Sequence, residues 1–254
     1  MRIEVAGTTH VGMKRNHNED NFLLLPEENF LAVADGMGGH SSGEVASGIA
    51  VAELEEFLKL SGKDQEATWP FKMDRAKNYD ENRLITAIRL ANSRIFEQAQ
   101  SDSKFRGMGT TLVTTLFVKD AAYVGWAGDS RVYRFRAGTL TQLSEDHSLL
   151  NDYIKAKKLT PEEIEAFPHK NVIVRALGMK DALQVDVVKD TPEPGDVYLL
   201  CSDGLSGMVP DAKIQDILQK TPELEKAVNQ LIDAANAAGG VDNVTAVLAR
   251  WSAS

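Results

Sequence analysis

The feature that most constrains how this chain folds is a set of short apolar runs. Each run lies next to an aspartate that has glycine nearby. Their length and β-branched content are typical of buried strands. The runs at residues 30–34, 121–127 and 197–201 lead into Asp35, Asp129 and Asp203, and Asp242 precedes the run at 244–251. A sheet-rich protein with a carboxylate at the tip of each of these strands is therefore predicted.

The remaining pattern predicts further strands, helical cover and one insertion. Strands are expected at 2–11 (an edge strand), 21–25, 112–118 and 131–136, and helices after Ser41, at 81–100, at 211–220 and from Leu224 onward. Apolar residues at helical spacing suggest that the helices pack on a sheet. We expect a single domain over 1–254, with residues 61–79 as a surface loop and the polar residues 144–182 as an inserted flap.

The glycine-rich stretch at residues 33–40 has several alternative readings. Asp35-Gly36 alone is a common hairpin turn. A phosphate-binding P-loop would need lysine where Glu44 stands, and a dinucleotide fingerprint would need a third glycine at Ser41. A strand tip followed by a helix N-terminus at Ser41 would also suit a cation that holds a phosphate.

The four aspartates together favour the interpretation that the strand tips bind a cation, but they do not establish it. Each one alone is explained by a turn. Carboxylates gathered at apolar strand tips repel each other unless positive charge lies between them. Oxygen ligands without a histidine cluster favour Mg²⁺ or Mn²⁺ over zinc.

Composition limits the class of partner and compartment. The formal net charge of -9 disfavours nucleic acid and anionic membranes as partners. Cys201 is the only cysteine, so no internal disulfide forms. The N-terminal residues lack a signal-peptide pattern, and no apolar run reaches the length of a membrane span. A cytoplasmic protein is expected.

Taken in order, six short motifs resemble the metal-dependent serine/threonine protein phosphatases of type 2C, in their bacterial form. The motifs span nearly the whole chain, and they are RNHNED (15–20), VADGMGGH (33–40), GTT (109–111), GDSR (128–131), SDG (202–204) and GVDNVT (240–245). The resemblance implies an α+β fold: a central β-sandwich of two antiparallel sheets, with helices on both outer faces in a four-layer αββα arrangement.

The resemblance also implies a cofactor and its ligands. Two Mn²⁺ or Mg²⁺ ions would share Asp35, with the Gly36 carbonyl on one of them and Asp203 and Asp242 on the second. Glu19 and Asp20 would hold metal-bound waters, and Asp129 would bind a third, weaker ion.

In such enzymes a hydroxide bridging the two ions attacks phosphorus directly, and Arg15 would grip the substrate phosphate as a planar fork of donors. Eukaryotic members carry a histidine, the proposed general acid, where this chain has Met37. His40 is the nearest alternative proton donor in the sequence. The alternative hypothesis is that His40 has a structural role. For His10, His17, His147 and His169 structural or solvated roles are expected.

We therefore expect a monomeric phosphatase that removes phosphate from serine and threonine of proteins modified by a serine/threonine kinase. Two alternatives stay open: a phosphoprotein-binding pseudo-enzyme, and a phosphoesterase for small molecules. The intact set of aspartates argues against the pseudo-enzyme. The flap at 144–182 is expected to flank the cleft and to select substrates.

Overall fold

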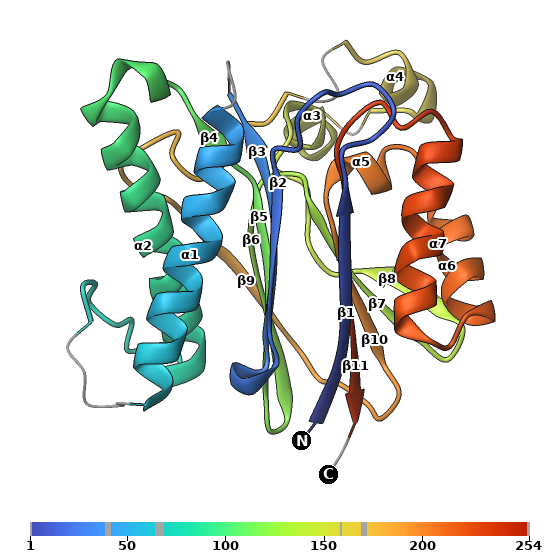
Figure 1. Cartoon of the computed structure of the whole chain (residues 1–254), viewed down its shortest axis with the longest axis horizontal. Helices are drawn as coiled ribbons and strands as arrows, with labels where there is room; N and C mark the ends of the chain where they lie inside the picture. Colours follow the sequence, from blue (N-terminus) through green and yellow to red (C-terminus); the bar gives the residue numbers. More distant parts are fainter. Residues whose placement is uncertain (1, 39–41, 64–68, 158, 169–171, 253–254) are drawn as a thin grey trace.

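The structure is a computed structural model that describes residues 2–38, 42–63, 69–157, 159–168 and 172–252. Two β-sheets face each other, and a pair of helices covers the outer face of each (Figure 1). Helices α1 (Ser42–Lys63) and α2 (Tyr79–Ser101) cover one sheet, and α6 (Asp211–Lys220) and α7 (Leu224–Ala237) cover the other. This confirms the expected four-layer αββα sandwich.

The first sheet contains both ends of the described chain. Its five strands run in the order β1 (Arg2–His10), β11 (Val244–Ser252), β10 (Val197–Cys201), β7 (Arg131–Arg136) and β8 (Thr139–Gln142). Neighbours pair antiparallel, and β1 is the edge strand that the sequence predicts. Figure 1 shows the two termini together at one end of the sandwich.

The second sheet carries the glycine-rich stretch. Its path is β2 (Asp20–Leu25), β3 (Phe30–Met37), β5 (Leu112–Val118), β6 (Ala121–Ala127) and β9 (Asp186–Asp190), and the short β4 (Gly109–Thr110) pairs with β3. All of its pairs are antiparallel as well. Strands β8 and β9 were not predicted, because each is short and mostly polar.

Three apolar layers hold the sandwich together, and β3 contributes to two of them. Leu31 and Val33 belong to the core between the sheets, whereas Phe30, Ala32 and Ala34 belong to the core beneath α1 and α2. This division follows from the alternation of side chains along a strand. A third core lies between α6, α7 and the first sheet. Because both faces of β3 are buried, its sequence reads as a continuous apolar run.

The helices differ from expectation mainly at their ends. Helix α1 continues to Lys63, so the predicted loop at 61–79 begins later. Helix α2 starts at Tyr79, where the Asn78 side chain caps it by accepting from the Glu81 N–H. The predicted cap at Ser41 lies outside the described residues. Short helical turns also occur at η1 (Pro26–Glu28), η2 (Ser103–Phe105) and α5 (Asp203–Ser206).

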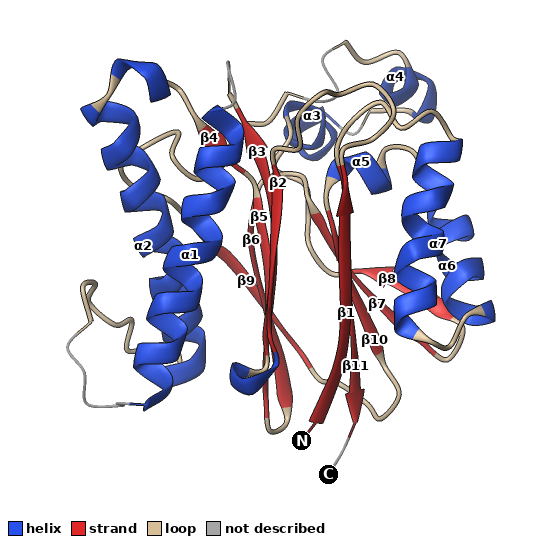
Figure 2. Ribbon diagram, viewed as in Figure 1, coloured by secondary structure: helices blue, strands red, loops and turns tan. Residues whose placement is uncertain are grey.

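The polar segment 144–182 projects from the end of the sandwich opposite the termini (Figures 1 and 2). It contains α3 (Leu149–Lys157) and α4 (Pro161–Glu165), the latter opened by a capping box at Thr160. Its final part is anchored to α2: the Asn92 amide donates to the carbonyls of Lys180 and Asp181. The segment therefore leaves and rejoins the sandwich at defined points, with α3 and α4 standing out from it.

Candidate metal centre

The predicted carboxylates meet at the end of the sandwich that bears α5 and the start of β11, away from the termini (Figure 1). Asp35 lies on β3, Asp203 opens α5, and Asp242 precedes β11. They line one pocket of about 210 Å³ together with Arg15, Glu19, Gly36, Met37, Gly38, Thr111, Ile173 and Asn243. The two sheets thus each supply carboxylates to a single site.

Pairing of β2 with β3 places the end of the RNHNED motif, Glu19 and Asp20, beside this pocket. Asp20 and Asp35 are directly opposed across the two strands. The Gly36 N–H donates to the Glu19 carbonyl over 3.1 Å, and the Glu19 N–H donates to Asn243 Oδ1 over 2.8 Å. Residues far apart in sequence are therefore locked at one spot by backbone hydrogen bonds.

A chain of hydrogen bonds orients the carboxylate of Asp20, which is buried. Its Oδ2 accepts from Ser202 Oγ at 2.9 Å and from Thr245 Oγ1 at 2.6 Å. The Thr245 hydroxyl donates its one hydrogen bond to Asp20, so its oxygen is the acceptor for Thr9 Oγ1 at 2.7 Å. Thr9 Oγ1 in turn accepts a hydrogen bond from the Asn18 amide at 2.8 Å. The other oxygen, Oδ1, is buried and has no partner among the residues that the structure describes.

Two hydroxyl residues hold the backbone at Asp35. The Thr111 N–H donates to the Asp35 carbonyl over 2.8 Å, and Thr111 Oγ1 lies 3.3 Å from the Asp35 N–H as its acceptor. The Ser130 hydroxyl, 2.6 Å from Thr111 Oγ1, extends this contact to the turn after β6. The aspartate is thereby fixed by the GTT and GDSR motifs together.

Gly36 sits where the start of α1 passes directly over β3. A β-carbon at position 36 would lie 2.2 Å from the Gly43 carbonyl oxygen and 2.5 Å from that of Glu19. Only glycine fits such a close approach of two backbones. The helix N-terminus is therefore held against the strand that carries Asp35.

The electrostatics of this group are unfavourable without added positive charge. Burial and the neighbouring carboxylates raise the pKa of Asp35 well above its ordinary value, and raise the pKa of Asp203 as well. Burial first, opposed in part by hydrogen bonds from Thr245 and Ser202, raises the pKa of Asp20 to about 6. Burial and the charge of Asp203 raise the pKa of Asp129 to about 7. A bound cation would reverse these shifts.

The residues present fit hydrated divalent cations. Among the described residues, Asp20 and Asp129 each keep one buried carboxylate oxygen without a hydrogen-bond partner. No group of three or more His, Cys, Asp or Glu side chains placed to hold a metal ion is found in the described part of the chain. Buried carboxylate oxygens of this kind suit a divalent cation, which they bind directly or through its waters.

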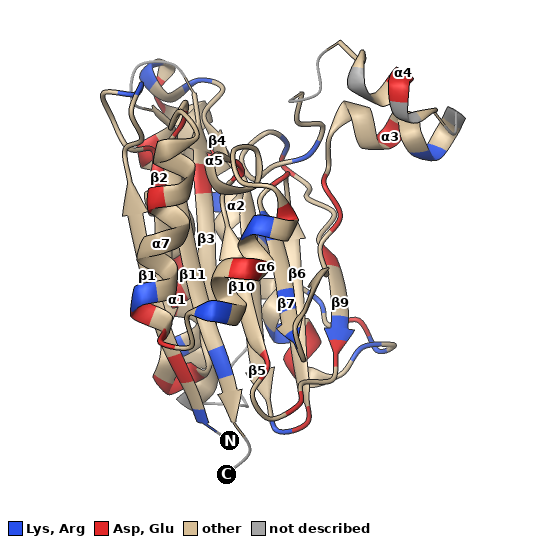
Figure 3. Ribbon diagram, turned by 90° about the vertical axis from the view of Figure 1, so that its right-hand side faces the viewer, with Lys and Arg blue, Asp and Glu red and all other residues tan. Residues whose placement is uncertain are grey.

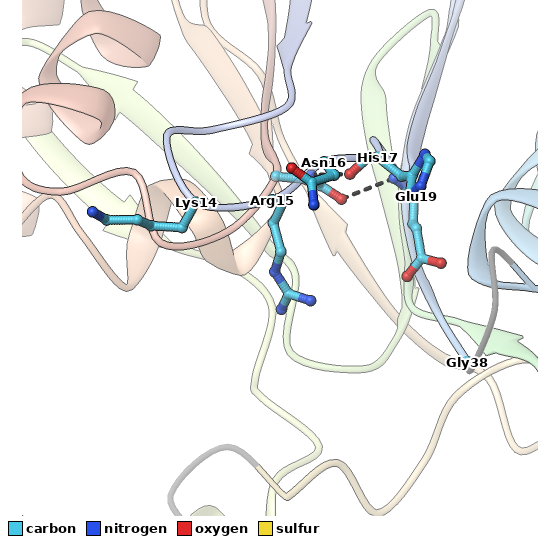
Figure 4. A pocket seen from close by; sticks show the side chains of 7 residues that line it. Lys14, Arg15, Asn16, His17, Glu19 and Gly38 are labelled. Atoms are coloured by element: carbon cyan, nitrogen blue, oxygen red, sulfur yellow. Dashed lines mark hydrogen bonds between the residues drawn. The ribbon is translucent and has the colours of Figure 1, made fainter.

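Arg15 is at the mouth of the pocket. Its Nη2 donates to Asp242 Oδ2 over 2.7 Å, and its side chain is 53% exposed. Figure 4 shows the side chains of Arg15 and Glu19 extending to the same side, while Lys14 points away from them. These residues line an outer hollow of about 650 Å³ with Asn16, His17, Gly38 and Asn243. The hollow shares Arg15 and Glu19 with the inner pocket.

Asp129 lines a neighbouring pocket of about 320 Å³, which shares Asp203 and Asp242 with the inner one. Arg131 closes one side of it by donating to Asp146 from both Nε (3.0 Å) and Nη2 (2.8 Å). The structure therefore places Asp129 beside the main site, next to Asp203.

Met37 lines the inner pocket, so the position of the eukaryotic histidine carries a side chain that cannot donate a proton. His40 lies outside the described residues, as does His169. His147 is buried: its Nδ1 accepts from the Gly128 N–H, and its Nε2 faces Asp186 at 2.9 Å. Since Nδ1 accepts a hydrogen bond, Nε2 carries the proton and donates to Asp186, and burial lowers the pKa of His147.

Several residues of the site were not predicted individually. Thr111, Ser130, Ser202, Asn243 and Thr245 lie inside the quoted motifs, but no spacing rule assigns them to a partner. Their position beside each predicted ligand was the available signal. Ile173, from the projecting segment, lines the inner pocket. Nothing in its local sequence marks it.

Known proteins are similar to this chain along most of its length. Residues 6–251 match the family model described as Protein phosphatase 2C. The chain is 36% identical over 247 residues to the serine/threonine phosphatase stp of Listeria welshimeri, covering 94% of this chain and 92% of that protein. It is also 36% identical over 249 residues to the protein phosphatase PhpP of Streptococcus pneumoniae, covering 97% and 96% respectively.

Solved structures show the same fold. The serine/threonine phosphatase PstP/Ppp of Mycobacterium tuberculosis superposes with a TM-score of 0.87 at 34% identity, covering the whole of both chains. The catalytic domain of PstP in complex with two manganese ions gives a TM-score of 0.82 at 34% identity and covers 99% of each chain. This chain belongs to the protein phosphatase 2C family, the metal-dependent serine/threonine protein phosphatases of bacterial type.

Proposed function

We propose that Asp35, Gly36, Asp203 and Asp242 hold the two Mn²⁺ or Mg²⁺ ions on which this protein phosphatase depends, with Glu19 and Asp20 binding their waters and Asp129 a third ion. The observation that carries this proposal is the convergence of carboxylates from both sheets. The pKa values of Asp35 and Asp203 are raised, and the buried Asp20 and Asp129 oxygens have no hydrogen-bond partner among the described residues. Bound divalent ions supply an activated water nucleophile and neutralise charge on the phosphoryl oxygens.

The protein's own groups would position the substrate phosphate. Arg15 uses Nη2 for Asp242, and no protein acceptor engages its Nη1 and Nε within the described residues. A guanidinium presents parallel donors that match two phosphate oxygens. Arg15 would therefore hold the phosphate at the junction of the inner pocket and the outer hollow.

Protonation of the departing serine or threonine oxygen needs a donor that Met37 does not supply, and we propose His40 for this role. Substituting His40→Ala should slow hydrolysis of phosphopeptides much more than that of an aryl phosphate, whose leaving group needs no proton. Equal effects on both substrates would exclude His40 as the proton donor.

The central experiment compares one carboxylate inside the site with one outside it. With Mn²⁺, the wild type should release phosphate from phosphoserine and phosphothreonine peptides, and excess chelator should stop this. Asp203→Asn should abolish release, because it removes the negative charge of a proposed ligand of the second ion. Asp216→Asn makes the same chemical change on the exposed face of α6 and should leave activity intact. Full activity of the Asp203→Asn variant would overturn the assignment.

We further propose that residues 1–254 form a single phosphatase domain and that its 144–182 flap selects among protein substrates. The contribution of Ile173 to the inner pocket supports a role near the substrate. Replacing 149–172, the part between the anchored ends, with the flap of another family member should change peptide preference. Hydrolysis of a small aryl phosphate should persist. Equal loss of both activities would argue for a structural role.

Phosphoproteins are the substrate class of this family, and we propose that this protein is a cytoplasmic monomer that reverses the action of a serine/threonine kinase. Among the described helices, none combines the length and apolar character of a membrane span. The acidic net charge supports proteins rather than nucleic acid or membranes as partners. Phosphoproteomes compared with and without the protein would identify its substrates.

A further inference from the structure

The pocket beside Asp203 and Asp242 is lined by both carboxylates and apolar side chains. Its lining residues include Asp129, Asp203 and Asp242 as well as Leu150 of α3, Met208 and Val241. The pocket has a volume of about 320 Å³ and shares Asp203 and Asp242 with the inner metal pocket. A polypeptide whose phosphate is held by ions at those aspartates therefore lies next to a pocket with apolar lining residues.

Three exposed or half-buried side chains, Met13, Met208 and Val241, surround the glycine pair 239–240, and we call them the apolar rim. Met13 is 61% exposed and Val241 is 54% exposed. The Met13 N–H donates to the Gly240 carbonyl over 2.7 Å, which fixes the Met13 loop beside Val241. A β-carbon at Gly239 would lie 3.3 Å from the Met208 methyl and 3.9 Å from Val241 Cγ1. The rim is therefore held in place by backbone contacts.

The cation among the lining residues of this pocket, Arg131, is already paired. Arg131 donates through both Nε and Nη2 to Asp146, and its Nη1 donates to the Tyr133 hydroxyl. A charged substrate side chain would gain little from Arg131, because its charge is balanced by a bidentate pair. An apolar side chain would instead remove apolar surface from water on both sides of the contact. Methionine suits this task, since its flexible thioether adapts to different partners.

We propose that the apolar rim, together with Leu150, binds an apolar side chain of the phosphoprotein substrate that neighbours the phosphoresidue in sequence. The subsite would make the enzyme prefer phosphoserine and phosphothreonine flanked by large aliphatic or aromatic residues. This inference rests on the proposed function, because it needs the phosphate to be held by Arg15 and by the ions at Asp203 and Asp242. It adds a sequence preference that the phosphate-binding groups cannot supply.

The test uses the full chain with Mn²⁺ and matched phosphothreonine peptides that differ only in flanking positions, carrying leucine, alanine or glutamate. The wild type should show a kcat/KM about tenfold higher for the best leucine peptide than for its alanine counterpart. In the Met208→Gln/Val241→Thr variant, this ratio should fall towards one. The kcat/KM for the alanine peptide and for an aryl phosphate should stay unchanged.

The control variant, Met73→Gln/Val188→Thr, makes the same two changes at exposed positions outside the pocket, where Met73 is 42% and Val188 36% exposed. It should keep the wild-type ratio. The single change Val241→Thr, at a mostly exposed side chain, serves if the double variant folds poorly.

The outcomes separate the two proposals. A wild type that hydrolyses no phosphopeptide with Mn²⁺ would overturn the proposed function. A wild type that hydrolyses the leucine and alanine peptides equally would overturn only the apolar subsite. If the rim variant instead weakens Mn²⁺ binding, measured by calorimetry, and slows all substrates alike, the pocket serves a cation and the subsite proposal fails.

Discussion

At the scale of single residues, Thr245 shows how a neutral side chain controls the charge that faces the metal site. Its hydroxyl and that of Ser202 both donate to one oxygen of Asp20, and the other oxygen has no partner in the described part of the protein. The proton directions follow from Asp20 alone, because an ionised carboxylate only accepts. The same arrangement would aim the free oxygen at water around a cation.

Replacing Thr245 by valine keeps its shape and removes this donor. We expect Thr245→Val to weaken Mn²⁺ binding about tenfold, the lower end of the range for outer-shell groups. Thr245→Ser keeps the hydroxyl and should bind nearly as the wild type does. Calorimetric titration of the chelator-treated proteins measures this directly. Unchanged affinity in Thr245→Val would show that the hydroxyl chain is only structural.

The raised pKa values of Asp20 and Asp129 predict a pH-dependent metal affinity. With values of about 6 and 7 against an ordinary 3.8, the folded metal-free protein holds more protons than the unfolded chain between about pH 4 and pH 7. These groups therefore favour the metal-free fold at low pH, and their contribution is lost as the pH rises through the raised values. Mn²⁺ must displace the same protons, so its affinity should increase from pH 5 to about pH 7.5 and then level off.

Calorimetry in two buffers with different ionisation enthalpies would count the protons released on Mn²⁺ binding. Release should be larger at pH 6 than at pH 8. Asp216→Asn, at an exposed aspartate whose pKa is lowered by Lys220, should not change the count. An affinity that is constant from pH 5 to pH 7.5 would contradict the carboxylate assignment.

At the scale of elements, the contact of β3 with the start of α1 positions the site. Gly36→Ala would place a β-carbon against the Gly43 and Glu19 carbonyl oxygens, and neither backbone has room to retreat. We expect a loss of about 3 kcal/mol in the free energy of unfolding, at the upper end for overpacking. Urea titration followed by circular dichroism measures it.

Gly48 supplies the matched control, since it lies within α1 and an added β-carbon there meets nothing within 4 Å. Gly48→Ala should stabilise the protein by about 0.5–1 kcal/mol, because alanine loses less entropy than glycine in a helix. A Gly36→Ala variant as stable as the wild type would mean that α1 can shift away from β3.

Most elements follow from local pattern. Strands β5, β6, β7 and β10 and helix α6 have the predicted bounds, because each is a run of consistent hydrophobic period between turn residues. Strands β8 and β9 were not predicted, because their composition is not typical of strands. They are strands because they pair with a neighbouring strand. Their partners, β7 and β6, supply the hydrogen bonds.

At the scale of the whole molecule, the site bridges the two sheets at one end of the sandwich. Asp20 and Asp35 belong to one sheet, while Asp203 and Asp242 adjoin strands of the other. Figure 3 shows acidic residues distributed over the ribbon rather than confined to one face, so net charge alone does not mark the site. Without a cation, repulsion between these carboxylates destabilises the end of the sandwich at which they meet.

Metal removal should therefore lower stability and loosen one end of the fold selectively. Saturation with Mn²⁺ at one hundred times its Kd adds about 2.7 kcal/mol, which predicts a Tm about 5–10 °C higher than in chelator. Hydrogen exchange should quicken on chelation at residues 19–20, 35–37 and 202–204. It should change little at Phe30 and Val197, at the opposite ends of β3 and β10. Asp203→Asn should show a much smaller Mn²⁺ effect on Tm.

The sequence alone predicted most of the strands and helices, the family resemblance, and Asp35, Asp129, Asp203 and Asp242 as candidate ligands of one metal site. Those features are local, because a strand tip, a glycine and an aspartate lie within a few positions of one another. Which hydroxyl orients Asp20, which glycine lets α1 approach β3, and which apolar side chains border the cleft were decided by tertiary structure. Many partners in these contacts lie far apart in the chain: Asp20 and Thr245, for example, are 225 positions apart. No periodicity encodes such a distance, and only the closing of two sheets against each other brings the groups into contact.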